Sequence, residues 1–433
     1  MTDVQPHEPP QTPGAVAVQS LGPVLEKDRI ATLDVLRGFA ILGIFLVNLQ
    51  FFAYPMMAGV MPDHAAMGPL DELAWAFVKT FCEMKFVSMF SMLFGAGMVV
   101  LYTRTQARGG SFVPLYLRRL VILLGFGAIH AFGFWYGDIL LIYAGLGVFL
   151  LLMRNLSAKT LAIIGVILLV VDFVVVTGCS GLNMLSMQQA VPAGAEEPLF
   201  GWEAIQSAQF NPFHEDWLAA EEAAYKNGPY ADALVFRSIT WVMMVVFSLF
   251  GFMQRVFGMF LIGAALMKAG VFAPAGKGTA ARLALLVIPG LLLELTATAV
   301  LWKAHGAVDW RMIPATAMHD LGATCLSLGY VGVIATICAG GAPTLLRPIA
   351  SVGRMALTCY LGETLIATFV MYHWGLGRFG DFSRAELIVF ALVVYAVLMV
   401  FATVWLKAFR MGPLEWVWRS LTYLHPQSLR HAG

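Results

Sequence analysis

Long, nearly uncharged apolar segments recur along this chain, and each is about as long as the hydrocarbon core of a bilayer. An α-helix needs about 20 predominantly apolar residues to cross that core. Of the 433 residues, 59% are hydrophobic and 12% are charged, whereas soluble proteins carry roughly 25% charged residues. Too few polar side chains are present to cover a water-soluble fold. The sequence therefore predicts an all-α, polytopic transmembrane helix bundle.

The apolar segments divide the chain into about ten spans. We expect them near residues 30–52, 83–103, 114–134, 137–154, 158–178, 237–270, 280–303, 316–340, 350–372 and 385–407. The sixth is longer than a straight crossing requires, and it contains Gly251, Gln254 and Arg255. That segment is expected to be tilted or broken, with its polar groups facing protein.

Arginine and lysine mark the orientation, because cytoplasmic loops carry an excess of them. Every even connection is basic, and Arg104, Arg108, Arg118 and Arg119 surround the second. The fifth connection is instead acidic. Both termini are therefore predicted to be cytoplasmic, with the acidic loop outside.

The chain is expected to have five parts. They are a disordered cytoplasmic tail (1–29), an N-terminal five-helix membrane half (30–178), an acidic extracytoplasmic loop (179–236), a C-terminal five-helix membrane half (237–410) and a cytoplasmic interfacial segment (411–433). The tail lacks a basic region feeding a short apolar stretch, so no cleaved signal peptide is expected. In the last part, Pro413 suits the first turn of a helix, and Trp416 and Trp418 favour the headgroup level.

Several classes of function are not supported. The formal net charge is +1, which gives no global basic surface for nucleic acid. The five cysteines lack CxxC or CxxxC spacing, so we expect neither a metal site nor a disulfide framework. No Walker-type spacing is present. We expect no tightly bound cofactor.

Polar groups inside apolar spans are expensive and are therefore functional candidates. In the first span, Arg37 and Asn48 lie eleven residues apart, which places both on nearly one helix face, about 16 Å apart. The alternative for Arg37 is a pair with Asp34 one turn back, which would make it a positive-inside anchor.

His130, Trp135 and Asp138 surround a tight turn between the third and fourth spans. A histidine shuttles protons near neutral pH, and a neighbouring carboxylate can fix its tautomer and raise its basicity. Alternatively, Asp138 only caps the fourth helix and Trp135 is an interface aromatic.

Further polar groups are candidates to line a cavity: Glu83, Trp135, His319, Tyr360 and Glu363. Arg255 stands out because a guanidinium within a span needs an anionic partner or a ligand phosphate. The sequence does not identify its partner.

Five stretches carry a family resemblance. They are LeuAspValLeuArgGlyPheAlaIleLeuGlyIle (33–44), PheSerMetLeuPheGlyAlaGly (90–97), TrpTyrGlyAspIleLeu (135–140), GlyArgMetAlaLeuThrCysTyrLeu (353–361) and MetGlyProLeuGluTrpValTrpArgSerLeuThrTyr (411–423). Together they resemble the domain-of-unknown-function-418 family of YeiB-like bacterial membrane proteins, over nearly the whole chain. The resemblance implies a multi-pass protein of the bacterial inner membrane.

The first stretch is also distantly similar to the transmembrane acyltransferase group, which includes heparan-alpha-glucosaminide N-acetyltransferase. That similarity implies transfer of an acyl group from a cytoplasmic donor, such as acetyl-CoA, to an acceptor on the far side. Arg37 falls on the shared Arg-Gly. Asn48 falls where bacterial O-acyltransferases have histidine and the heparan enzyme has asparagine, so His130 is the better candidate for a base.

We therefore expect an acyltransferase in which His130 is the base, Asp138 orients it and Asn48 stabilises the oxyanion. Arg37 and Arg255 would bind the donor. The expected partners are membrane lipids, an acyl-CoA co-substrate and an extracytoplasmic sugar or lipid acceptor, and homo-oligomerisation is left open. The alternative is a transporter or a lipid- or small-molecule-binding protein without covalent chemistry.

Overall fold

The computed structural model describes residues 30–188, 215–304, 309–341 and 343–431. The helices are α1 (Ala31–Ala53), α2 (Met56–Val60), α3 (Pro69–Phe81), α4 (Lys85–Ala107), α5 (Phe112–Ala128), the π-helix η2 (Ile129–Phe134), α6 (Leu140–Leu152), α7 (Ala158–Gln188), α9 (Glu215–Lys226), α10 (Tyr230–Ser248), α11 (Phe252–Lys268), the 3-10 helix η3 (Pro274–Gly276), α12 (Lys277–Ala284), α13 (Val287–Ala304), α14 (Met312–Cys338), the 3-10 helix η4 (Thr344–Leu346), α15 (Arg347–Arg354), α16 (Ala356–Met371), α17 (Arg384–Ala408) and α18 (Pro413–Tyr423).

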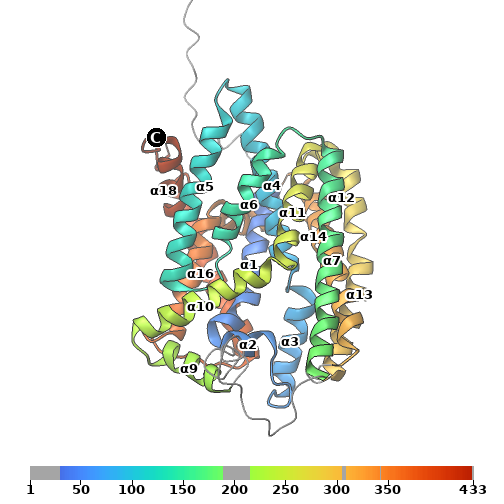
Figure 1. The fold of residues 1–433 in the computed structure, drawn as a ribbon. Helices are drawn as coiled ribbons and strands as arrows, with labels where there is room; N and C mark the ends of the chain where they lie inside the picture. The colour runs from blue at the N-terminus through green and yellow to red at the C-terminus, as the bar shows by residue number, and fades with distance from the viewer. Residues whose placement is uncertain (1–29, 189–214, 305–308, 342, 432–433) are drawn as a thin grey trace, which may run out of the picture.

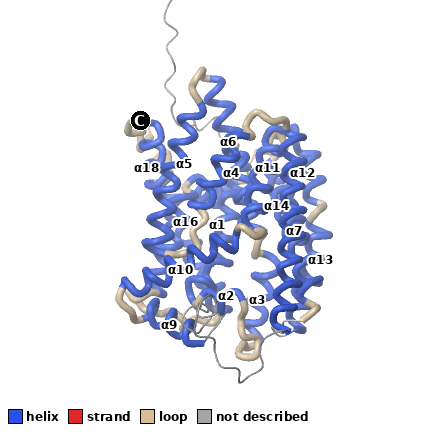
Figure 2. The backbone as a smooth tube through the Cα atoms, in the orientation of Figure 1, coloured by secondary structure: helices blue, strands red, loops and turns tan. Residues whose placement is uncertain are grey.

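Helices make up the fold, as Figure 2 shows. In the described ranges, the remaining regular structure is one isolated bridge between Phe409 and Arg430. Eight helical stretches are long and apolar enough to cross a membrane, and α6 and α16 are shorter apolar helices. These findings confirm the prediction of an all-α membrane bundle.

Most long helices stand side by side along one direction (Figure 1). At one end lie α18 and the C-terminus, and at the other lie α2 and α9 (Figure 1). We call these the α18 end and the α9 end.

Three of the expected spans are each divided into two helices. The sixth divides at residues 249–251, where Gly251 has φ +134°, a conformation that favours glycine. The seventh divides between α12 and α13, just before Pro289, whose ring nitrogen cannot donate a helical hydrogen bond. The ninth divides at Met355 between α15 and α16. The break in the sixth span is one of the two alternatives expected from its length, whereas hydropathy alone does not detect the breaks in the seventh and the ninth.

Small residues let the central helices approach closely. A Cβ on Gly95 would lie 1.8 Å from the Phe260 carbonyl oxygen, and one on Gly263 would lie 1.9 Å from the Met92 carbonyl oxygen. The backbones of α4 and α11 therefore touch where the helices cross, as small residues permit in membrane bundles.

The two expected membrane halves interleave. Helix α1 packs on α15, α16 and α17 from the second half, and α7 packs on α11 and α14. Helix α7 also continues to Gln188, beyond the expected boundary at 178. The expected tail (1–29) and residues 189–214 of the expected acidic loop lie outside the described residues.

Candidate functional site

His130 lies in the π-helix η2, which continues α5. Its side chain is buried, and its Nδ1 lies 2.7 Å from Asp138 Oδ2. The other Asp138 oxygen accepts a hydrogen bond from the backbone N–H of Leu141 at 2.8 Å. Asp138 therefore both caps the start of α6 and orients the imidazole, so the two roles weighed from the sequence coexist. π-Bulges of this kind are frequent at functional sites.

Thr364 completes this arrangement from α16, and sequence reasoning missed it. Its Oγ1 lies 2.9 Å from His130 Nε2. A carboxylate only accepts hydrogen bonds, so Nδ1 donates to Asp138. In the neutral ring, Nε2 then accepts a hydrogen bond from the threonine hydroxyl. The available signal is that Thr364 directly follows Glu363, one of the candidate cavity-lining residues.

An aromatic layer covers His130 on the side toward the α9 end. The rings of Phe52 and Trp135 stack with centroids 4.1 Å apart. Trp135 Nε1 and the Tyr136 hydroxyl both donate to the Phe51 carbonyl oxygen, at 3.3 and 3.2 Å. Trp135 therefore closes the site on this side instead of lining an open cavity.

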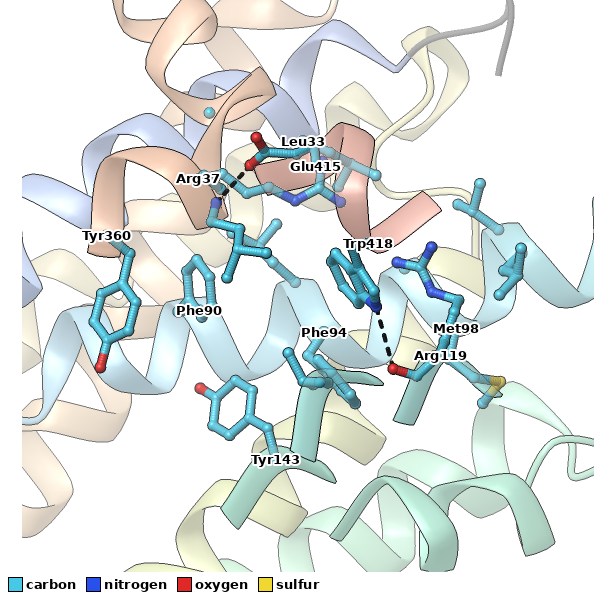
Figure 3. Close-up of a pocket in the computed structure, with 18 of the residues that line it drawn as sticks. Leu33, Arg37, Phe90, Phe94, Met98, Arg119, Tyr143, Tyr360, Glu415 and Trp418 are labelled. Atoms are coloured by element: carbon cyan, nitrogen blue, oxygen red, sulfur yellow. Dashed lines mark hydrogen bonds between the residues drawn. The ribbon is translucent and has the colours of Figure 1, made fainter. Parts of the chain in front are cut away.

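A cavity of about 300 Å³ lies toward the α18 end (Figure 3). Its lining includes five arginines and two carboxylates: Arg37, Arg104, Arg119, Arg354, Arg419, Asp34 and Glu415. Arg37 Nη1 donates to Asp34 Oδ1 at 3.0 Å, so the predicted local pair exists within the cavity wall. Among the described lining residues, guanidinium groups outnumber carboxylates, a composition that favours an anionic ligand.

The end of the cavity away from α18 is formed by the aromatic side chain of Tyr360. Figure 3 shows Tyr360 at one end and Arg119 with Trp418 at the other. The Arg119 guanidinium lies 4.1 Å from the Trp418 ring centroid. The Tyr360 ring lies 5.2 Å from the His130 ring, centroid to centroid. One side chain, Tyr360, therefore separates the cavity from His130.

Asn48, Glu363 and Trp135 do not line this cavity. Asn48 is half-buried on α1, and its side chain makes no hydrogen bond to the described residues. Glu363 is buried, and its Oε1 has no hydrogen-bond partner in the described ranges. The structure thus brings together Arg37, Tyr360, His130 and Asp138, and does not bring Asn48 into contact with them.

Arg255, His319 and Glu83 belong to a second, buried polar cluster. Arg255 pairs with Asp172 at 2.9 Å and with Asp320. His319 Nδ1 lies 2.9 Å from Glu294 Oε2 and contacts Glu83. Arg255 therefore has two carboxylate partners and does not line the arginine-rich cavity.

Within the second cluster, Lys85 Nζ lies 2.8 Å from Glu294 Oε1, and both side chains are fully buried. Sequence reasoning missed Glu294 and Asp172 as site residues. The signal was available, because each is an isolated carboxylate within an apolar run. Among the described residues, no group of three or more His, Cys, Asp or Glu side chains could hold a metal ion.

The fold and the cavity define a multi-pass α-helical membrane protein with an internal, arginine-lined site. The chain belongs to the DUF418 family, whose profile, described as "Protein of unknown function (DUF418)", matches residues 266–425. It is 36% identical to the Bacillus subtilis (strain 168) protein named "Uncharacterized protein YxaH" over 424 residues, covering 95% of this chain and 98% of that protein. It is 35% identical to "Uncharacterized protein YeiB" of Escherichia coli (strain K12), covering 94% and 98%.

Proposed function

We propose that this protein is a membrane acyltransferase, which moves an acyl group from a phosphate-bearing thioester such as acetyl-CoA to an acceptor hydroxyl or amine. One observation carries the proposal. The arginine-lined cavity ends on Tyr360, and the buried His130–Asp138 pair lies directly behind that side chain. A donor-binding region and a candidate general base are therefore adjacent.

The cavity suits the two chemical parts of such a donor. Guanidinium groups bind phosphates through paired, charge-assisted hydrogen bonds, which supports a phosphate position near Arg37, Arg119 and Arg419. Phe90, Phe94 and Tyr143 line the opposite part, where an apolar arm and its acyl group would avoid water. In the proposed orientation, the α18 end faces the cytoplasm and the acceptor approaches from the α9 end.

The polar groups near His130 support general-base chemistry. Nε2 would take the proton of an acceptor hydroxyl, and Asp138 would stabilise the imidazolium that forms. Tyr360 is buried, and its hydroxyl has no well-aligned hydrogen bond to the described residues. It is therefore better situated than Asn48 to donate a hydrogen bond to a developing oxyanion.

The test uses the full chain in purified vesicles with radiolabelled acetyl-CoA and a mixture of bacterial lipids and sugars as acceptors. His130→Ala should lower acetyl release by about two to four orders of magnitude. His373→Ala, which removes an imidazole outside the site, serves as the matched control. A wild-type protein that neither binds nor consumes acyl-CoA would overturn the proposal.

A second candidate is a carrier without covalent chemistry. The buried charges around Arg255 and the break between α10 and α11 favour it, because such features accompany pathways through membranes. This candidate predicts movement of an anionic amphiphile across the vesicle membrane with its thioester intact.

A further inference from the structure

We infer that Thr364 is the nucleophile of a Thr–His–Asp triad, and that it carries the acyl group as an ester between donor and acceptor. This inference rests on the proposed acyl transfer and adds a covalent step to it. It concerns the order of events at His130, not whether transfer takes place.

The three side chains have the hydrogen-bond sequence that a catalytic triad requires. Asp138 Oδ2 lies 2.7 Å from His130 Nδ1, and His130 Nε2 lies 2.9 Å from Thr364 Oγ1. All three residues are at most 3% exposed. Triads are recognised by this geometry and not by chain order or fold.

The hydrogen bonding of Thr364 differs from that of its neighbour Thr368. In a helix, a threonine hydroxyl commonly donates to the carbonyl oxygen four residues earlier. Thr368 does so at 2.7 Å. The corresponding distance from Thr364 to the Tyr360 carbonyl oxygen is 3.4 Å, whereas His130 Nε2 is closer, at 2.9 Å. The Thr364 hydroxyl is thus directed to the imidazole.

A covalent carrier also fits the way the site is closed. The cavity approaches from the α18 end and stops at Tyr360, one side chain short of His130, and Phe52 and Trp135 cover His130 toward the α9 end. A donor from one side and an acceptor from the other therefore cannot both contact His130 in this conformation. An ester on Thr364 lets the donor leave before the acceptor arrives.

The two steps balance. First, Thr364 Oγ1 attacks the thioester carbonyl, its proton passes to His130 Nε2, the C–S bond breaks, and the departing thiolate takes that proton. Next, an acceptor hydroxyl gives its proton to His130 and attacks the ester carbonyl. The C–O bond to Thr364 breaks, and the proton returns to Oγ1. No oxidant, reductant or other co-reactant is needed.

The test incubates the purified full chain with radiolabelled acetyl-CoA in the absence of acceptor. We expect one acetyl group per chain, mapped by mass spectrometry to Thr364 and released by alkali as an ester. Thr364→Val should abolish labelling and lower transfer at least about 100-fold. Thr364→Ser should keep the label, and Thr368→Val, the matched control, should behave like wild type.

Three outcomes overturn the inference separately from the proposed function. If Thr364→Val transfers acetyl at the wild-type rate, or if the label maps to another residue, Thr364 is not the nucleophile and acyl transfer stands. If wild type turns over acetyl-CoA with acceptor but is never labelled, transfer is direct. If wild type does not consume acetyl-CoA at all, both the inference and the proposed function fail.

Discussion

Glu415 caps the first turn of α16 through Thr358. Its Oε2 accepts a hydrogen bond from Thr358 Oγ1 at 2.6 Å, and its Oε1 accepts from the backbone N–H groups of Leu357 and Thr358 at 2.7 and 3.2 Å. Helix α16 carries both Tyr360 and Thr364. The last helix of the chain therefore fixes the start of the helix that supplies the candidate site.

Removing this cap should destabilise the bundle. Glu415→Ala leaves two backbone donors at the start of α16 without a partner, so we expect a loss of about 2 kcal/mol in unfolding free energy. Glu415→Gln keeps one acceptor oxygen and should lose less. Thermal unfolding in detergent would measure both, and equal stability of Glu415→Ala and wild type would contradict the capping role.

The arginines of the cavity should govern donor affinity more than turnover. Arg119→Gln should raise KM for acetyl-CoA about ten- to a hundredfold, the value of a charge-assisted hydrogen bond, and change kcat little. Arg118→Gln removes the same charge one residue away, and Arg118 does not line the cavity. If both variants raise KM equally, the effect comes from the overall positive electrostatic potential of this region and not from direct contact between Arg119 and the donor.

The buried pair of Lys85 and Glu294 gives a prediction about stability. Lys85→Met leaves the Glu294 carboxylate without its cation, which should cost about 3–5 kcal/mol. The double variant Lys85→Met/Glu294→Leu removes both charges and should recover much of that loss. Denaturant or thermal unfolding of the two variants measures the difference, and a double variant no more stable than Lys85→Met would refute the pairing argument.

Helix α9 should loosen as the pH rises. Burial raises the pKa of Glu221 to about 7, although the Met56 N–H donates to its carboxylate at 3.3 Å. A carboxyl whose pKa is higher in the folded protein stabilises it fully below the unfolded pKa of 4.5, and this contribution is lost as the pH rises through about 7. The full loss of folding free energy from this ionisation is about 3 kcal/mol.

Hydrogen exchange of residues 215–226 would measure this loosening between pH 5.5 and pH 8.5. Glu221→Gln stays neutral across the range, so its exchange protection, corrected for the intrinsic pH dependence, should be flat. Wild-type protection that is equally flat would exclude Glu221 as the titrating group.

Local signals in the sequence predicted local structure. Apolar length predicted the membrane helices, and Pro413 marks the start of α18 as expected. His130 and Asp138 are only eight residues apart, so their proximity could be anticipated. Thr364 lies 234 residues from His130, and no periodicity in one helix reports which distant helix packs against it. The cavity likewise depends on how α1, α4, α5, α16 and α18 pack together.

The break at Gly251 shows a second reason why the sequence could not decide between a tilted and a broken sixth span. Its φ of +134° is open to glycine at little cost, yet glycine is also common in continuous membrane helices. The residue type therefore permits a break without requiring one. The same holds for Arg255. The sequence predicts that its guanidinium needs an anionic partner, but only the packing of distant helices shows that the partners are Asp172 and Asp320.

The stacked rings of Phe52 and Trp135 have a consequence for the membrane potential, because they lie where the cavity is closed. A hollow that enters a membrane from one face leaves only a thin barrier between two compartments, and a wetted connection through it would let ions leak down the membrane potential. Phe52 and Trp135 stack against each other, and Trp135 and Tyr136 donate to the Phe51 carbonyl oxygen, so in the proposed orientation these rings would fill that remaining thickness and exclude water from it. Such a seal would let the protein hold a polar chamber inside the bilayer while the membrane stays electrically insulating.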